Sequence, residues 1–281
     1  MKKPQWITGA IVVALVVCVY ATTITEIFGN NVKKKEPTAN SGTSAITIDS
    51  ILSHAKERLS PTQVSRLNLL ENSISRGDVL NQKVHVFHQL ARFWSDTVQV
   101  FEPYAWYTAE SARLVNSENS LTFAAHLFLD NLKGEENPAL KQWKALQAKD
   151  LFERSLRINP ENDSSEVGLG MVHLYGGLGM PMEGIQRIRT VAEKHPGNVY
   201  AQMALGHASV TSGQFEKAIE RFETVLKIEP KNLEAILSLA DTYERTGDKA
   251  KAVDWYRKSL LIVDIPRLRE EVERRIAELE K

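Results

Sequence analysis

Two histidines and a run of glycines are the features of this sequence whose types and spacing could do chemistry. His85 and His88 lie three residues apart, a spacing that can hold a metal ion on a helix, but no third ligand lies near them in the sequence. The glycines follow a predicted helix, at Gly168, Gly170, Gly176, Gly177 and Gly179. A phosphate loop follows a strand and has the spacing G-x-G-x-x-G or that of a Walker loop, which this run lacks. We therefore predict neither a metal site nor a cofactor.

Nucleophilic chemistry has no candidate residues either. The single cysteine, Cys18, lies in an apolar segment, so neither a thiol nucleophile nor a disulfide framework is expected. The motifs G-x-S-x-G and H-E-x-x-H do not occur. We predict no catalytic residues and no enzymatic activity.

The composition is that of a folded, helical protein. Of 281 residues, 43% are apolar and 25% are charged, close to the usual shares for globular chains. Lys plus Arg equals Asp plus Glu at 35 each, which argues against nucleic-acid binding because such proteins usually carry a basic excess. Only 15 glycines and 10 prolines interrupt the chain, which favours long helical stretches.

The N-terminal segment is predicted to be a membrane anchor. Residues 4–25 carry no charge, and a helix of that length spans about 33 Å, enough for a bilayer core. A cleavable signal peptide is the alternative. We expect residues 1–28 to form a single transmembrane helix that contacts the membrane through residues 4–28. Residues 29–45, rich in Lys, Asn, Ser and Thr, are expected to be a flexible linker.

The orientation of the anchor follows from charge. Lys2 and Lys3 on a short N-terminus favour its retention in the cytoplasm, although Lys33, Lys34 and Lys35 act in the opposite sense. We therefore expect a single-pass inner-membrane protein with its C-terminal body on the periplasmic side.

Internal repetition is the strongest signal in the sequence. Three segments, 165–198, 199–232 and 233–266, align at a spacing of 34 residues without gaps. Small residues recur where two helices of a hairpin would cross, large ones surround that crossing, and prolines end the second helices. These repeated residues are Met171, Tyr175, Gly184, Pro196, Leu205, Gly206, Ala218, Phe222, Pro230, Leu239, Ala240, Tyr243, Ala252 and Tyr256. Val172 departs from the small residue expected at its position.

This set of residues resembles the tetratricopeptide repeat (TPR) family, in which each repeat is a pair of antiparallel helices. The resemblance implies an all-α fold, a right-handed solenoid of helical hairpins preceded by the single transmembrane helix. It covers residues 165–266 as three repeats and extends, as diverged hairpins, over residues 46–164. Residues 267–281 are expected to be a capping helix with a narrow apolar stripe.

The resemblance also places a partner-binding groove on the concave side of the solenoid, lined by the first helix of each repeat. The residues expected there are Leu169, His173, Tyr200, Met203, His207, Val210, Glu234, Leu237, Asp241 and Arg245. The Lys and Asn clamp that chaperone-cofactor TPRs use for a carboxylate is absent, and the groove is apolar in its middle and acidic toward its C-terminal end. It should therefore prefer a protein or peptide with apolar anchors and some basic character.

We predict from these features a membrane-anchored, non-enzymatic scaffold for protein–protein interaction. The layout is similar to bacterial membrane-anchored TPR proteins, which leaves an accessory role in an envelope assembly pathway such as cytochrome c maturation as an alternative. Self-association of the array into a homo-oligomer is a further alternative.

Overall fold

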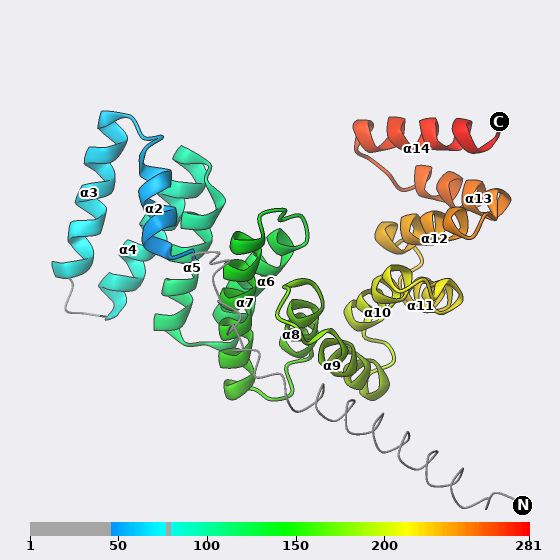
Figure 1. Ribbon diagram of the computed structural model, residues 1–281, viewed down its shortest axis with the longest axis horizontal. Helices are drawn as coiled ribbons and strands as arrows, with labels where there is room; N and C mark the ends of the chain where they lie inside the picture. Colours follow the sequence, from blue (N-terminus) through cyan, green and yellow to red (C-terminus); the bar gives the residue numbers. More distant parts are fainter. Residues whose placement is uncertain (1–45, 77–79) are drawn as a thin grey trace, which may run out of the picture. The chain divides into compact units, whose positions relative to one another are not determined.

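The structure, a computed structural model, describes residues 46–76 and 80–281, and in these residues it is helical throughout, without a strand (Figure 1). The predicted anchor at 1–28 and the linker at 29–45 lie outside the described residues. Across the described residues, no helix combines the length and the apolar character needed to cross a membrane.

Successive helices pair into antiparallel hairpins. Ahead of the hairpins, α2 (Ile48–Lys56) packs on α5 and α3 (Pro61–Arg76) packs on α4. The paired helices are α4 (Leu80–Arg92) with α5 (Phe101–Val115), α6 (Glu118–Leu132) with α7 (Pro138–Ile158), α8 (Asp163–Tyr175) with α9 (Pro181–Lys194), α10 (Val199–Thr211) with α11 (Phe215–Ile228), and α12 (Leu233–Arg245) with α13 (Lys249–Leu260). A π-helical turn, η1 (Phe93–Val98), extends α4, and α14 (Pro266–Leu279) follows the last hairpin.

The starts of the repeat helices are fixed by asparagines. Asn162, Asn198 and Asn232 each precede a first helix, and each side-chain oxygen accepts a hydrogen bond from the backbone N–H three residues on. Such a cap satisfies one of the free donors at a helix start. Each asparagine stands two residues after a proline that ends the preceding helix, so the motif Pro-x-Asn marks every repeat boundary in this part of the chain.

The hydrophobic core runs along the array as clusters shared between neighbouring hairpins. One cluster joins α5 through α10, a second joins α2 through α5, and two further clusters carry the core through α10–α13 and α12–α14. Each hairpin thus buries apolar residues between its own two helices and against the neighbouring hairpins, as expected of a repeat protein.

A buried charge interrupts the core between α5 and α7. Lys144 on α7 is only 2% exposed, and its ammonium group lies 3.0 Å from Glu102, 2.5 Å from Glu135 and 2.6 Å from Asn131. It also lies 5.3 Å from the ring centroid of Phe101. Because a buried cation is stable only when its partners surround it, these contacts tie the start of α5 and the α6–α7 connection to α7.

The first repeat differs from the gapless alignment by two residues. The helix caps Asn162 and Asn198 lie 36 residues apart, whereas Asn198 and Asn232 lie 34 apart. The second helices begin at the regular spacing of 34, at Pro181, Phe215 and Lys249. The turn between α8 and α9 covers residues 176–180, longer by two residues than the turn at 212–214. The register predicted for α8 is therefore wrong by two residues.

The corrected register explains the departure at Val172. Gly170, and not Val172, stands where Gly206 stands in the next repeat. A Cβ atom at Gly170 would lie 2.6 Å from Cγ1 of Ile188 and 2.8 Å from the carbonyl oxygen of Gly184, so only glycine allows α8 and α9 to approach this closely. By the same shift, Leu169 takes the place predicted for Met171, and His173 takes the place predicted for Tyr175.

Helix α14 repeats the first-helix pattern once more. Its Val272 and Ile276 are buried against the α13 hairpin, and Arg269 donates hydrogen bonds to the carbonyl oxygens of Leu260 and Val263. The face that a second helix would cover is polar instead. Where α12 places Leu239, Ala240 and Tyr243, α14 places Glu273, Arg274 and Ala277, all exposed. This polar face agrees with the predicted capping helix.

Candidate binding groove

The first helices of the C-terminal repeats bring one set of repeat positions into a column. This column contains His207 on α10, Asp241 on α12 and Arg275 on α14. The three residues are 34 apart in turn, so they occupy the same position on the first helices of two repeats and on the end helix. Helix α12 packs against α10, and α14 packs against α13, the helix that forms a hairpin with α12. The column therefore continues the groove from the repeats onto the end helix.

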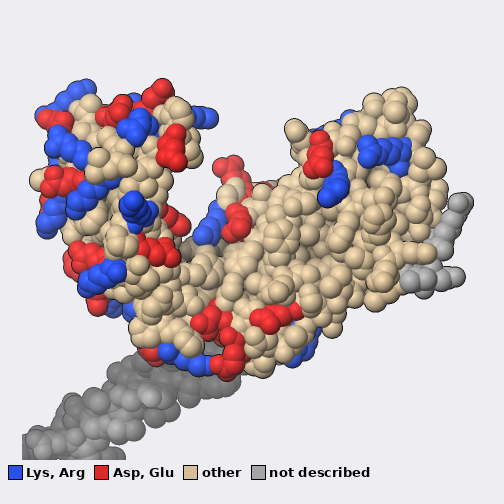
Figure 2. All heavy atoms as spheres, turned by 180° about the vertical axis from the view of Figure 1, so that it is seen from behind, with Lys and Arg blue, Asp and Glu red and all other residues tan. Residues whose placement is uncertain are grey.

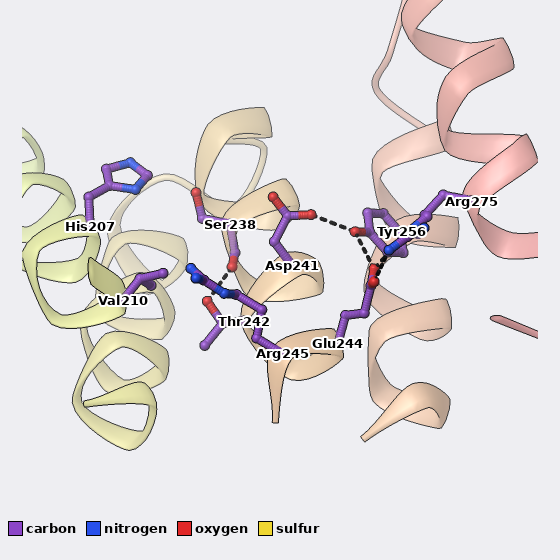
Figure 3. Close-up of a pocket in the computed structure, with 9 residues that line it drawn as sticks. All are labelled: His207, Val210, Ser238, Asp241, Thr242, Glu244, Arg245, Tyr256 and Arg275. Atoms are coloured by element: carbon purple, nitrogen blue, oxygen red, sulfur yellow. Dashed lines mark hydrogen bonds and ion pairs between the residues drawn. The ribbon is translucent and has the colours of Figure 1, made fainter. Parts of the chain in front are cut away.

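Two adjoining cavities lie along this column. The first, of about 310 Å³, is bounded by His207 and Val210 on one side and by Tyr256 and Arg275 on the other, with α12 as its floor (Figure 3). The second, of about 380 Å³, lies between α12 and α14 and adds the apolar residues Leu237, Leu268 and Val272. Asp241, Tyr256 and Arg275 line both cavities. A space-filling view from behind shows acidic and basic side chains interspersed at the C-terminal end of the array, whereas the visible face of the N-terminal end carries few charges (Figure 2).

Tyr256 holds the polar centre of the site. Its hydroxyl oxygen lies 2.5 Å from Oδ1 of Asp241 and 3.1 Å from Oε2 of Glu244. Burial, reinforced by the two carboxylates, raises the pKa of Tyr256, so the phenol keeps its proton at neutral pH. That single proton can be donated to only one of the two carboxylates at a time.

An ion pair joins the two helices across the site. Arg275 donates from Nε to Oε2 of Glu244 at 2.9 Å, and from Nη2 to Oε1. Its Nη1 donates to Glu278 on the next turn of α14 at 2.8 Å. These hydrogen bonds lower the pKa of Glu244 and raise that of Arg275, so both groups are charged at neutral pH.

At the α10 end of the groove, histidine and carboxylate meet in the same way. Nε2 of His207 lies 3.1 Å from Oε1 of Glu234, the first-turn residue of α12. The hydrogen bond from His207 lowers the pKa of Glu234. The ring of His207 also lies 5.3 Å from that of Phe222, centroid to centroid, so the histidine is held between the groove surface and the hairpin core.

The predicted groove residues divide into an accessible and a buried group. Glu234, Asp241 and Arg245 are exposed, and His207, Val210, Leu237 and Tyr200 are half-buried. Leu169, His173 and Met203 are 2%, 4% and 5% exposed, so their prediction as groove residues is wrong. For Leu169 and His173 the cause is the two-residue shift in α8, which turns both side chains into the hairpin. Met203 instead belongs to the core cluster between α10 and α13.

Tyr200 is only partly available to a partner. Its ring packs against the large core cluster and lies 5.5 Å, centroid to centroid, from the ring of His126 on α6. His126 in turn packs on Phe152 at 5.1 Å and hydrogen-bonds to Ser164 at 2.8 Å. The ring of Tyr200 therefore packs between three hairpins, and it contributes more to packing than to the exposed surface of the groove.

The sequence reasoning missed Arg275 and the placing of Tyr256 in the groove. Arg275 was part of a helix expected only to cap the array, although its distance of 34 residues from Asp241 was a usable signal. Tyr256 was expected as a core residue of its repeat, and it is buried, but its hydroxyl reaches the groove. The hydroxyl reaches the groove because the tyrosine side chain is long enough to cross the hairpin. A repeat pattern does not specify the length of the side chain.

The candidate chemical residues are engaged in ordinary contacts. His88 hydrogen-bonds to Ser111 at 2.7 Å, and His85 lies 3.2 Å from the amide nitrogen of Gln89. In the part of the chain that the structure describes, no three or more His, Cys, Asp or Glu residues are grouped so as to hold a metal ion. The glycines of 168–179 lie in α8 and in the longer turn that follows it.

Comparison with known families identifies the repeats. The family model for the tetratricopeptide repeat matches residues 203–265, from α10 to the turn before α14. This match confirms the tetratricopeptide repeats predicted in this part of the chain. No curated protein sequence matches the chain.

Solved structures with the same fold span most of the chain. A TPR protein of Thermus thermophilus, TTC0263, is 14% identical, with a TM-score of 0.52 over 70% of this chain and 98% of its own. PilW, described as a type IV pilus biogenesis factor, is 19% identical, with a TM-score of 0.51 over 71% of this chain and 86% of its own. MamA of Desulfovibrio magneticus RS-1 is 20% identical, covers 66% of this chain and 96% of its own, and has a TM-score of 0.44. At these identities, the first two show a shared fold and nothing more.

Proposed function

We propose that this chain, which carries tetratricopeptide repeats over residues 203–265, is a non-enzymatic scaffold that holds a segment of a partner protein in the groove formed by α10, α12 and α14. The TPR fold itself indicates a role in protein–protein interaction. One observation carries the specific site: the same repeat positions of three successive helices line two adjoining cavities.

The chemistry of the groove supports a protein segment as its ligand. Half-buried aliphatic side chains, Val210 and Leu237, stand beside the charged residues Asp241 and Arg245. A groove that combines apolar contacts with a few oriented polar groups is typical of peptide recognition, in which apolar anchors give affinity and charges give specificity.

The proposal is tested by photo-crosslinking from defined positions on the full chain. A photoreactive amino acid replaces Val210 or Arg245 in the groove, or Glu220 or Lys227 on the exposed surface of α11. We expect one and the same partner to be labelled from both groove positions and not from the α11 positions. Labelling only from α11 would place the partner on the outer surface and contradict the proposal.

Loss of binding gives the complementary measurement. Val210→Ala with Leu237→Ala should weaken capture of that crosslinked partner about tenfold or more, because truncated anchors typically cost more than about 1.4 kcal/mol. The matched control is Glu220→Ala with Lys251→Ala on the outer surface, which should bind normally. Circular dichroism must show the same helicity for both double variants.

We also propose that the scaffold is attached to a membrane through residues 4–28, with residues 46–281 on the periplasmic side. The support is the uncharged run at 4–25 and the two lysines that precede it. A C-terminal alkaline phosphatase fusion should be active in intact cells, and a C-terminal fluorescent reporter that folds only in the cytoplasm should be dark. The reverse pattern would invert the orientation.

A further inference from the structure

We infer that the polar centre of the groove binds an arginine or lysine side chain of the partner segment, and that Arg275 occupies this place in the free protein. The inference rests on the proposed function and specifies the chemistry of its ligand. Three steps support it: a shortage of hydrogen-bond donors, an arginine already seated on the site, and an apolar cavity beside it.

The first step is the shortage of donors around Tyr256. Asp241 and Glu244 both lie within hydrogen-bond distance of its hydroxyl oxygen, but the phenol has one proton to give. Among the described residues, Asp241 forms no ion pair of its own, and its carboxylate is exposed to the first cavity and the second. Glu244 also accepts two hydrogen bonds from Arg275, so Asp241 is the carboxylate that is short of donors and could accept N–H groups from a ligand.

The charges around the site point in the same direction. Around Tyr256, Asp241 and Glu244 carry two negative charges and Arg275 one positive charge. Glu271, Glu278 and Arg274 line the second cavity as well, where Arg274 lies 3.8 Å from Glu271 and Glu278 pairs with Arg275. Arg245 also lines the first cavity, but its guanidinium lies 5.6 Å from the ring centroid of Phe215. In Figure 3 that guanidinium extends toward Val210, away from Tyr256. The centre of the site is thus left acidic.

The second step is the fit of Arg275 itself. Its guanidinium faces Glu244 with two nitrogens, the arrangement in which arginine pairs best with a carboxylate. The pair is close to the surface, since Arg275 is about half exposed. An arginine from a partner would form the same two hydrogen bonds to Glu244, so it can replace Arg275 at small cost.

The third step defines what stands next to the cationic side chain. The second cavity continues from Asp241 along Leu237, Leu268 and Val272. A segment whose arginine reaches Tyr256 would therefore place a neighbouring side chain against this aliphatic wall. The preferred ligand is a segment with a basic residue directly beside an aliphatic one, a combination that the paired cavities distinguish from a purely basic tail.

An array of capped peptides tests the inference on the full-length chain. Each peptide has Arg, Lys, citrulline or Glu at its centre and randomised Leu, Val and Ile on either side. Citrulline keeps the shape of arginine and removes its charge. We expect the arginine peptides to bind at least about tenfold more tightly than their citrulline counterparts, a difference that falls with rising salt.

Two variants assign that difference to the site. Asp241→Asn should abolish the preference for arginine over citrulline, since it removes the carboxylate that lacks a cation. Arg275→Gln should strengthen binding of the arginine peptides severalfold, because it removes the competing guanidinium. Arg267→Gln, an exposed arginine of the same helix that lines neither cavity, is the matched control and should bind like the unaltered chain.

The outcomes separate this inference from the proposed function. Equal binding of arginine and citrulline peptides, an unchanged preference in Asp241→Asn, or an array without any arginine-dependent binding would overturn the inference. The crosslinking experiment would still uphold the groove as a partner site. A preference for the Glu peptides would overturn the inference as well, and would indicate a role for Arg245 in an acidic ligand. Absence of groove crosslinks would remove the proposed function.

Discussion

The ring of Phe222 occupies the space beside Gly206 that a side chain on the glycine would need. A Cβ atom at Gly206 would lie 2.8 Å from Cζ and 2.9 Å from Cδ1 of Phe222. The two residues face each other across the α10–α11 hairpin, and both are buried. The contact sets how closely the two helices of the repeat approach, since the ring packs directly on the helix backbone.

Enlarging this glycine should therefore destabilise the hairpin. We expect Gly206→Leu to lower the free energy of unfolding by about 1–3 kcal/mol, because the added side chain must displace the buried ring of Phe222. Urea denaturation followed by circular dichroism measures the change. Gly197→Ala is the matched control, as a Cβ atom there meets nothing within 4 Å. Equal stability of the two variants would mean that α10 and α11 do not pack in this register.

The corrected register of the first repeat makes a separate prediction. At Gly170 a Cβ atom would meet Ile188 at 2.6 Å and the backbone oxygen of Gly184 at 2.8 Å, and backbone atoms cannot turn away. We expect Gly170→Ala to cost about 1–3 kcal/mol of unfolding free energy. Gly134→Ala, in open space, should be nearly neutral. A neutral Gly170→Ala would restore the gapless alignment, in which Val172 takes this position.

The repeat family and its helices could be predicted from sequence because the hairpin crossing permits few residue types. Gly206, Ala218, Ala240 and Ala252 are small for steric reasons, and their spacing of 34 residues carries that information in the sequence. The end helix could be predicted as well, from its narrow apolar stripe. The extra residues in the turn after α8 could have been found, since Pro160 and Pro196 are 36 residues apart.

The groove residues were harder to predict, because the repeat spacing predicts the side of the helix on which a residue lies but not how deeply neighbouring hairpins bury it. Tyr200 and Met203 occupy inward positions of α10, yet neighbouring hairpins cover much of the first and nearly all of the second. Lys144 illustrates the same limit. A lysine in a helix is expected in solvent, but Lys144 is paired with Glu135 in the turn before its own helix and with Glu102 on α5, which is distant in the sequence.

The buried Lys144 should be important for stability. Lys144→Met leaves Glu102 and Glu135 without their shared cation, and breaking such a group from one side costs about 3–5 kcal/mol. Adding Glu102→Gln and Glu135→Gln to the same chain should recover most of the loss, since the amides carry no charge. Lys194→Met is the control, because its pair with Glu161 lies at the surface. An equal, small effect of both lysine variants in urea denaturation would contradict the buried ion-pair arrangement.

The burial of His173 predicts a pH dependence. Burial lowers the pKa of His173, Arg187 and Lys149 act in the same sense, and Glu183 partly opposes it. The nitrogen Nδ1 is buried and has no hydrogen-bond partner among the residues that the structure describes. The folded state thus favours the neutral ring, whereas the unfolded chain takes up a proton near the ordinary value of about 6.5. Stability should therefore fall as the pH is lowered below about 6.5.

Variants isolate this contribution. His173→Phe should flatten the dependence of the unfolding free energy between about pH 7 and about pH 5. It should not remove the dependence altogether, because burial also lowers the pKa of His126. His85→Gln, on the exposed surface of α4, should leave the slope unchanged. A slope that His173→Phe does not alter would show that the ring is solvated.

Variants of Tyr200 distinguish a role in packing from a role in partner binding. Burial raises the pKa of its hydroxyl, and its ring contacts His126 and the core that joins α5 to α10. We expect Tyr200→Ala to lower the free energy of unfolding by about 2–4 kcal/mol, somewhat less than the cost of about 3–5 kcal/mol typical of a fully buried aromatic residue, because Tyr200 is half-buried. Tyr200→Phe keeps the ring and should change stability little. Leu237→Ala, in the open groove, should weaken partner capture with a smaller loss of stability. If Tyr200→Ala instead kept full stability and lost only partner capture, Tyr200 would be an exposed anchor of the groove, and the ligand would extend along α10 beyond the two cavities.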